Sequence, residues 1–173
     1  MNIKKVVVGT LNENCYVLIK DGFALIIDPG DEADKIKKVV ENNKVLGILI
    51  THYHFDHVGC LDAFKEIYPT AKIVDYKTKG DVKINIFEFK VIETYGHTMD
   101  SVSYYFDKND ILFTGDFLFK GTIGNFEEDN EEYMFNSLKI FKYMSTNVRI
   151  YPGHDSETTV EEELKNNPFL KGI

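Results

Sequence analysis

The stretch Thr51-His52-Tyr53-His54-Phe55-Asp56-His57-Val58-Gly59 places three imidazoles and one carboxylate within six positions. It directly follows a short apolar run, residues 45–50, whose β-branched side chains predict a buried strand. The histidine-rich stretch is therefore predicted to form the loop at the end of this strand, with a helix beginning at His57. Binding groups are often placed on such loops, because a rigid scaffold holds them in position.

Nitrogen and oxygen donors packed this closely indicate a transition-metal site, because neutral imidazole and carboxylate suit zinc, manganese or iron. His52 and His54 can project to one side of an extended segment. Asp56 and His57 follow too soon to join the same three-ligand face, which suggests two metal ions. A surface cluster of solvated histidines is the alternative. It is disfavoured because protonated rings would repel one another and because such a cluster has no reason to follow a buried strand.

Composition limits the classes of protein to which the chain can belong. Its 173 residues fit a single domain over 1–173 and are enough to bury a core. The formal net charge of -8 argues against a nucleic-acid backbone as the main ligand. Two cysteines do not make a disulfide framework. The start of the chain does not resemble a signal peptide, and no run of about 18 apolar residues predicts a membrane span, so the cytoplasm is the expected location.

The rest of the chain is predicted to alternate hairpins, helices and strands. Asp21-Gly22 between two apolar runs is a strong hairpin signal, and Asp107–Asp110 joins a second hairpin. Helices are predicted after a cap at Asp31, over 57–68, after a cap at Asp129 or Asn130, and over 159–166. In the third of these, Met134, Leu138 and Phe141 are predicted to form a buried stripe. Further strands are predicted over 4–8, 72–76, 82–92 (one bent strand or two) and 148–151. This pattern predicts an α/β fold with a large antiparallel share, sheets in the middle and helices outside.

All five histidines of the chain follow predicted strands. His97 follows Gly96 and His154 follows Gly153, and Asp116 also follows a glycine at a strand end. Random placement would put some histidines on exposed helix faces. We therefore expect the histidines to converge with two aspartates at one mouth of the sheets. The seven candidate metal ligands are His52, His54, Asp56, His57, His97, Asp116 and His154.

Two metal ions in such a site have a clear chemical use. A bound divalent ion lowers the pKa of its water to about 7, and a carboxylate can bridge two ions. Hydroxide held there would attack an electrophilic carbonyl or phosphoryl group, without an activated serine or cysteine.

The motifs T-H-x-H-x-D-H, G-H-T, G-D and P-G-H, in this order, resemble those of the metallo-β-lactamase superfamily. The resemblance extends from Gly9 to Phe169 and is nearest to small proteins of the glyoxalase II type, which hydrolyse thioesters. It implies a four-layer αβ/βα sandwich, with two mixed β-sheets flanked by helices. It also implies an assignment of donors: His52, His54 and His97 to one metal ion, Asp56, His57 and His154 to a second, and Asp116 between them.

The resemblance further implies a dinuclear metal-dependent hydrolase, in which metal-bound hydroxide attacks a small thioester or a related acyl substrate. Two divalent ions are implied, zinc first, with iron and manganese as alternatives. Asp56 would orient the hydroxide and Asp116 would bridge, so these are the candidate catalytic residues. Tyr53, Tyr95 and Phe126 are candidates for the mouth of the site. Neither nucleic acid nor a membrane is an expected partner.

Two differences from full-length glyoxalase II concern the glutathione moiety. The C-terminal helical domain that helps to bind it in the family is expected to be missing. In the loop 124–127, Asn125 stands where the family carries a basic residue and Glu127 where it carries an aromatic one. Two alternative activities remain open: a mononuclear iron oxygenase resembling persulfide dioxygenases, and a lactonase that differs only in its pocket.

Overall fold

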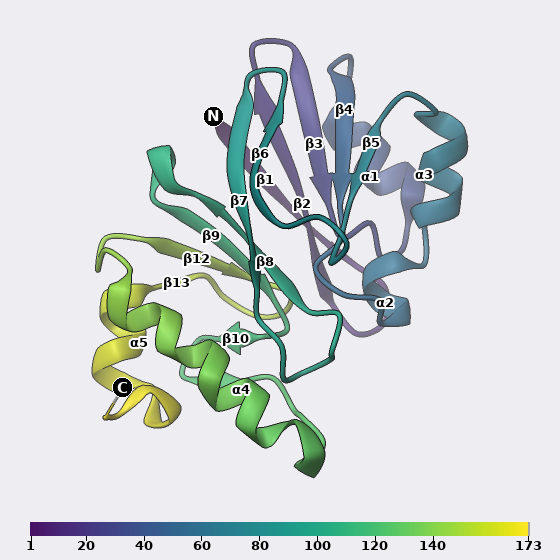
Figure 1. Ribbon diagram of the computed structural model, residues 1–173. Coiled ribbons are helices and arrows are strands. Elements are labelled where there is room, and N and C mark those ends of the chain that lie inside the picture. The colour runs from purple at the N-terminus through teal and green to yellow at the C-terminus, as the bar shows by residue number, and fades with distance from the viewer. Residues whose placement is uncertain (173) are drawn as a thin grey trace.

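The computed structural model describes residues 1–172 and contains two mixed β-sheets with helices on both outer sides (Figure 1). The first sheet has the order β1-β2-β3-β4-β5, formed by β1 (Asn2–Val8), β2 (Glu13–Lys20), β3 (Phe23–Ile27), β4 (Lys44–Leu49) and β5 (Lys72–Val74). The second has the order β13-β12-β9-β8-β7-β6, formed by β6 (Gly80–Ile84), β7 (Phe87–Glu93), β8 (Val102–Phe106), β9 (Ile111–Gly115), β12 (Arg149–Pro152) and β13 (Thr158–Thr159). The αβ/βα fold class predicted for the chain is confirmed.

The helices cover the outer faces of the two sheets. In Figure 1, α1 (Ala33–Val40) and α3 (Leu61–Ile67) lie beside the first sheet, and α4 (Glu131–Leu138) and α5 (Val160–Asn166) lie beside the second. The short helix α2 (Phe55–Val58) follows the loop after β4. No helix within residues 1–172 is long and apolar enough to cross a membrane.

The connections of the first sheet follow from its pairing. β2 and β3 are antiparallel and joined by Asp21 and Gly22, which both have positive φ, as a tight hairpin of this hand requires. β3, β4 and β5 are parallel, so each step needs a crossover, which α1 and then α2 with α3 supply. The loop that leaves the carboxyl end of β4 begins at Ile50 and carries the histidine-rich stretch.

The core between the sheets is aromatic. Tyr16 of the first sheet packs edge-on against Phe113 of the second, with 5.1 Å between ring centroids. Burying one such side chain contributes roughly 1.5–3 kcal/mol. On the outer faces, Phe64 of α3 is buried against the first sheet. The predicted stripe of Met134, Leu138 and Phe141 is buried against the second sheet.

A set of hydrogen bonds joins β2 of the first sheet to residues 152–155 of the second, which are the last residue of β12 and the loop after it. The Asn14 side-chain amide donates to the carbonyl oxygens of Pro152 and Asp155, at 3.0 and 3.1 Å. The Tyr16 hydroxyl donates to the Pro152 carbonyl at 2.7 Å, and the Asn14 backbone amide donates to the Gly153 carbonyl at 2.7 Å. We call these four bonds the inter-sheet clamp.

Several predicted boundaries were wrong. The first helix follows Glu32, which has a left-handed φ of 49°, and no side chain caps it, so the predicted Asp31 cap is absent. α2 begins at Phe55 and not at His57. Residues 82–92 lie in two strands, which is one of the two predicted alternatives, because Asn85 turns the chain with a φ of 53°. The ribbon of β10 (Leu118–Phe119) and β11 (Thr122–Ile123), and the edge strand β13, were not predicted.

Candidate metal centre

The seven side chains singled out in the sequence lie together beyond the carboxyl ends of β4, β7, β9 and β12. We call them the donor cluster. Its members come from the loop after β4 (His52 and His54), from α2 (Asp56 and His57), and from the segments after β7 (His97), β9 (Asp116) and β12 (His154). The structure therefore brings together residues separated by as much as 102 positions, His52 and His154, as expected from the sequence.

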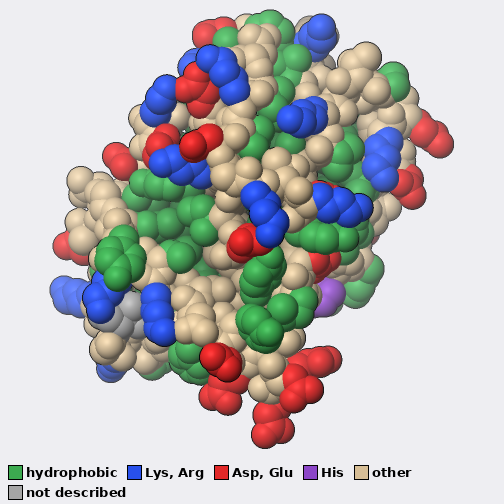
Figure 2. All heavy atoms as spheres, in the orientation of Figure 1, with side chains coloured by type: hydrophobic (Ala, Val, Ile, Leu, Met, Phe, Trp, Pro, Cys, Tyr) green, Lys and Arg blue, Asp and Glu red, His purple; other side chains and the backbone are tan. Residues whose placement is uncertain are grey.

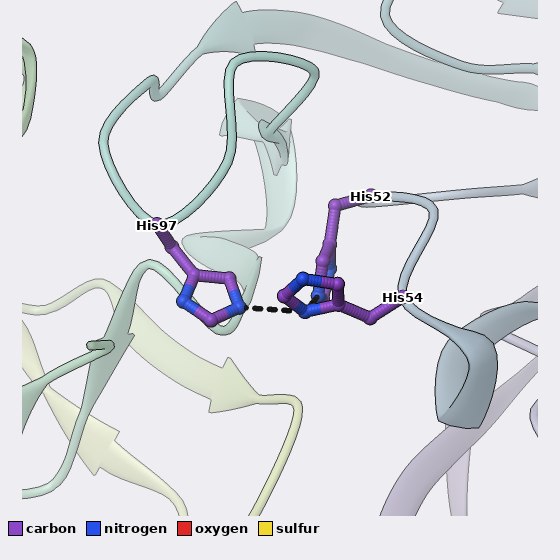
Figure 3. A group of neighbouring side chains, drawn as sticks. All are labelled: His52, His54 and His97. Atoms are coloured by element: carbon purple, nitrogen blue, oxygen red, sulfur yellow. Dashed lines mark hydrogen bonds between the residues drawn. The ribbon is translucent and has the colours of Figure 1, made fainter. Parts of the chain in front are cut away.

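Three ring nitrogens of the donor cluster converge on one point (Figure 3). His54 Nδ1 lies 3.1 Å from His52 Nε2 and 3.0 Å from His97 Nε2. One shared proton can satisfy only one of these contacts, whereas a cation would satisfy all three lone pairs. His52, His54 and His97 form the same group that the family resemblance assigns to one metal ion.

Backbone carbonyls fix the orientation of two rings. His97 Nδ1 lies 2.6 Å from the Asn125 carbonyl oxygen, and His154 Nδ1 lies 3.2 Å from the Leu11 carbonyl oxygen. A carbonyl oxygen can only accept, so in each ring Nδ1 carries the proton and Nε2 keeps its lone pair. Both Nε2 atoms are therefore free to bind a metal, and partners of this kind orient metal-bound imidazole.

Asp28 and Thr51 orient two further rings. Asp28 Oδ2 accepts from Thr51 Oγ1 at 2.6 Å and from His57 Nδ1 at 3.0 Å. Because Thr51 gives its hydrogen to Asp28, its oxygen accepts from His52 Nδ1 at 3.1 Å. Neither residue was predicted to be functional from the sequence. For Asp28, the sequence Asp28-Pro29-Gly30 predicted only the end of a strand, and in the structure Asp28 has a φ of 50° there.

A second group of donors consists of Asp56, His57 and His154. Asp56 Oδ2 lies 3.3 Å from His154 Nε2 and 3.9 Å from His57 Nε2. Asp116 reaches both groups. Its Oδ1 lies 3.2 Å from His57 Nε2, and its Oδ2 lies 3.5 Å from His154 Nε2 and 3.7 Å from His97 Nε2.

Two buried atoms of the donor cluster form no hydrogen bond, although they lie 3.2 Å from each other. His57 Nε2 and Asp116 Oδ1 are buried without a hydrogen-bond partner among residues 1–172, and such atoms are destabilising when left unpaired. Burial acts to raise the pKa of Asp116, but His57 outweighs it and lowers the pKa to about 2, so the carboxyl is ionised. The residues therefore fit two metal ions.

The imidazoles respond differently to burial. Burial lowers the pKa of His52 and of His97, so both rings are neutral, the form that binds metal. Burial also acts to lower the pKa of His57, but contacts with Asp116 and Asp28 outweigh it and raise the pKa to about 11. A metal ion bound at His57 would therefore displace a proton.

Glu13 is a buried carboxyl beside the donor cluster that the sequence analysis missed. Its side chain is 1% exposed, and neither oxygen has a hydrogen-bond partner within residues 1–172. Oε1 lies 3.9 Å from His57 Nδ1. Burial and the nearby charge of Asp28 raise the pKa of Glu13 from 4.5 to about 10, so this side chain is a neutral acid at neutral pH.

The Glu13→Gln variant should therefore gain stability over the wild type as the pH rises. The unfolded wild-type carboxyl loses its proton near pH 4.5 while the folded one keeps it to about pH 10, so this group makes wild-type stability fall across that interval. The fall is at most about 1.4 kcal/mol per pH unit, and glutamine has no such dependence.

The measurement is urea denaturation of chelator-treated protein at about pH 6 and about pH 8. Glu66→Gln, an exposed site on α3, should show no pH-dependent difference. A stability difference for Glu13→Gln that is equal at the two pH values would contradict the neutral acid.

Two cavities open beside the donor cluster and share His54 as a lining residue. The larger, of about 500 Å³, is lined by Leu11, His54, Phe55, Asp56, Asp116, Phe119, His154 and Asp155. The smaller, of about 270 Å³, is lined by His54, His97, Asn125, Phe126 and Glu127. Of the three aromatic candidates for the mouth, Phe126 lines a cavity. Tyr53 donates to Asp75 at 2.7 Å and Tyr95 donates to Glu93, and neither lines these cavities.

The fold has counterparts among known proteins, and the chain belongs to the metallo-beta-lactamase superfamily. The model of that family matches residues 8–83 and 79–157. A "Probable metallo-hydrolase YqgX" of Bacillus subtilis (strain 168) is 33% identical over 100% of this chain and 99% of its own length. A "Hydroxyacylglutathione hydrolase GloC" of Haemophilus influenzae is 29% identical over 98% of each chain.

Solved structures give the same fold. The crystal structure of BLEG-1 B3 metallo-beta-lactamase has a TM-score of 0.91 and 28% identity, over 99% of this chain and 100% of that one. TTHA1623 in a di-iron-bound form has a TM-score of 0.86 and 27% identity, over 96% and 100%. ETHE1 from Myxococcus xanthus has a TM-score of 0.86 and 26% identity, over 97% and 84%. The family is that of metallo-hydrolases, and it implies a dinuclear metal site at the donor cluster.

Proposed function

We propose that this protein is a dinuclear metal-dependent hydrolase of thioesters. His52, His54 and His97 would hold one ion, and Asp56, His57 and His154 the other. The observation that carries the proposal is the position of Asp116, whose two oxygens lie within 3.2–3.7 Å of ring nitrogens from both groups. The similarity to a hydroxyacylglutathione hydrolase supports a thioester as the substrate.

When bound, the two ions would supply hydroxide at neutral pH and stabilise negative charge on the carbonyl oxygen of the substrate. The side chains of this protein would do the rest. Asp56 and Asp116 both line the larger cavity, where a carboxylate can orient the nucleophile and accept its proton. Phe55 and Phe119 supply apolar walls for the acyl group. Asp28 and the Asn125 carbonyl hold two imidazoles in fixed orientations, so the donors are preorganised.

The test is metal content measured together with thioester cleavage. Untagged protein is loaded with zinc, iron or manganese, desalted and analysed for metal, and free thiol is then followed with N-acetylcysteamine and glutathione thioesters. We expect about two ions per chain, cleavage that a chelator abolishes, and recovery when metal is restored. Fully loaded protein that cleaves no thioester would refute the proposal.

A second candidate is a mononuclear iron oxygenase of the persulfide dioxygenase kind, which the likeness to ETHE1 favours. A protein with this activity would contain about one iron per chain and would take up oxygen with glutathione persulfide. It would release no thiol from the thioesters. A lactone and a β-lactam belong in the same screen, the latter because of the likeness to a B3 metallo-beta-lactamase.

A further inference from the structure

Apart from the donor histidines and Asn125, the walls of the two cavities are apolar or acidic. Leu11 and Phe55, which line the larger cavity, are 51% and 74% exposed, so they offer apolar surface at its rim. Asp155 lines the same cavity, and Glu127 lines the smaller one. Among residues 1–172, no lysine or arginine lines either cavity. Lys120 follows Phe119 in the chain but does not line either of them.

An acidic run continues from the wall of the smaller cavity. Between residues 127 and 132, five side chains are exposed carboxylates, and residues 121–138 contain no lysine or arginine. None of the five forms an ion pair within residues 1–172. Figure 2 shows acidic side chains gathered around the lower end of α4, below the exposed histidine. The wall of the smaller cavity is therefore bordered by carboxylates that form no ion pair within residues 1–172.

This acidic wall is held against the donor cluster. The Asn125 carbonyl accepts the hydrogen bond from His97 Nδ1 at 2.6 Å. One residue earlier, Gly124 packs so closely that a Cβ there would lie 1.8 Å from the Asp116 carbonyl oxygen. The backbone is therefore fixed at residues 124 and 125, just before Glu127. The wall of the smaller cavity accordingly has little freedom to move away from a substrate.

We propose that the site takes thioesters whose thiol carrier is uncharged, and that it disfavours carriers with carboxylates, such as glutathione. This inference rests on the proposed thioester hydrolase function. A carboxylate in a binding site is usually paired with arginine or lysine, and neither lines these cavities. At physiological salt, charges within about 8 Å are only partly screened, so Glu127 and its acidic neighbours would repel a carboxylate. An uncharged carrier would instead pack on Phe126, which lines the smaller cavity beside Glu127, while the acyl group lies against Phe55 and Phe119 in the larger one.

The first experiment compares two esters of the same acyl group on the metal-loaded enzyme. S-lactoyl-N-acetylcysteamine has an uncharged carrier, and S-lactoylglutathione has a carrier with two carboxylates. We expect kcat/KM to favour the uncharged carrier by about tenfold or more at about 20 mM salt, and the preference to shrink toward about 500 mM, because salt screens repulsion between charges.

The second experiment reverses one charge on the wall. Glu127→Lys should raise the ratio of kcat/KM for the glutathione ester to that for the N-acetylcysteamine ester by about tenfold. Glu66→Lys changes the net charge equally at an exposed position on α3, away from the cavities, and should leave the ratio unchanged. A wild-type preference for glutathione, or an unshifted ratio in Glu127→Lys, overturns the inference while the hydrolase proposal stands. Failure to cleave either ester refutes the hydrolase proposal and this inference with it.

Discussion

Replacement of Asp116 by alanine is expected to lower kcat/KM by about a thousandfold or more and to reduce the metal content well below two ions per chain. The reason is geometric: Asp116 approaches His57, His97 and His154, so one change removes a ligand from both proposed ion sites. Metal-ion stabilisation of a transition state contributes several kcal/mol, and about 4 kcal/mol corresponds to three orders of magnitude in rate.

The measurements are steady-state hydrolysis, elemental analysis and far-ultraviolet circular dichroism of the purified variant. Asp116→Asn serves as a second variant, because the amide fills the same space without the charge. Cys60→Ser is the control: Cys60 is half-buried at the start of α3 and lies outside both cavities, so activity should stay within about twofold. If Asp116→Ala kept two ions and normal turnover, Asp116 would not be the shared ligand.

Gly153→Ala is expected to weaken metal binding by about 10–100-fold, although it removes no donor atom. A Cβ at Gly153 would lie 2.2 Å from Asp116 Oδ1 and 2.7 Å from His57 Cε1. Both side chains are buried and held by other contacts, so the added methyl group must displace two proposed ligands. Displacing the support of a metal ligand typically weakens metal binding 10–100-fold, and overpacking destabilises a fold by roughly 1–3 kcal/mol.

The measurement for Gly153→Ala is metal affinity, obtained by competition with a chromogenic chelator, together with the midpoint of urea denaturation. Gly80→Ala is the matched control. Gly80 has a φ of 73°, so alanine there is strained by about 1–2 kcal/mol, but its Cβ would meet no atom within 4 Å. It should lose stability and keep full metal affinity. Equal metal affinity in the two variants would show that the close approach of Gly153 to Asp116 and His57 has no role in metal binding.

The sequence predicted those features that depend on neighbouring residues. Asp21-Gly22 defined a hairpin, and the apolar spacing of Met134, Leu138 and Phe141 defined the buried face of a helix. The convergence of the histidines was also predictable, because each follows a strand and strand ends meet at the edges of sheets. Their assignment to two metal ions stays a proposal, to be decided by the metal analysis of the Asp116 variants.

The features that the sequence did not predict depend on contacts between distant segments. β13 is a two-residue strand whose existence depends on pairing with β12. Glu13 lies in β2, and the packing of α2 against that strand places it beside His57. Asp28 supports two imidazoles because the loop after β4 folds back over the end of β3. No pattern of neighbouring residues marks Glu13 or Asp28, since the partners of both lie more than twenty residues away.

The inter-sheet clamp has a consequence for how the protein matures. Four of the seven donors, residues 52–57, leave the ribosome early, whereas His154 follows almost a hundred residues later. Asn14 and Tyr16 can close on residues 152–155 only when nearly the whole chain has been made. Until then the nascent chain lacks His154, and closing so long a loop has an entropic cost. An ion that needs His154 as a ligand would therefore be held only after residues 14–16 and 152–155 have met.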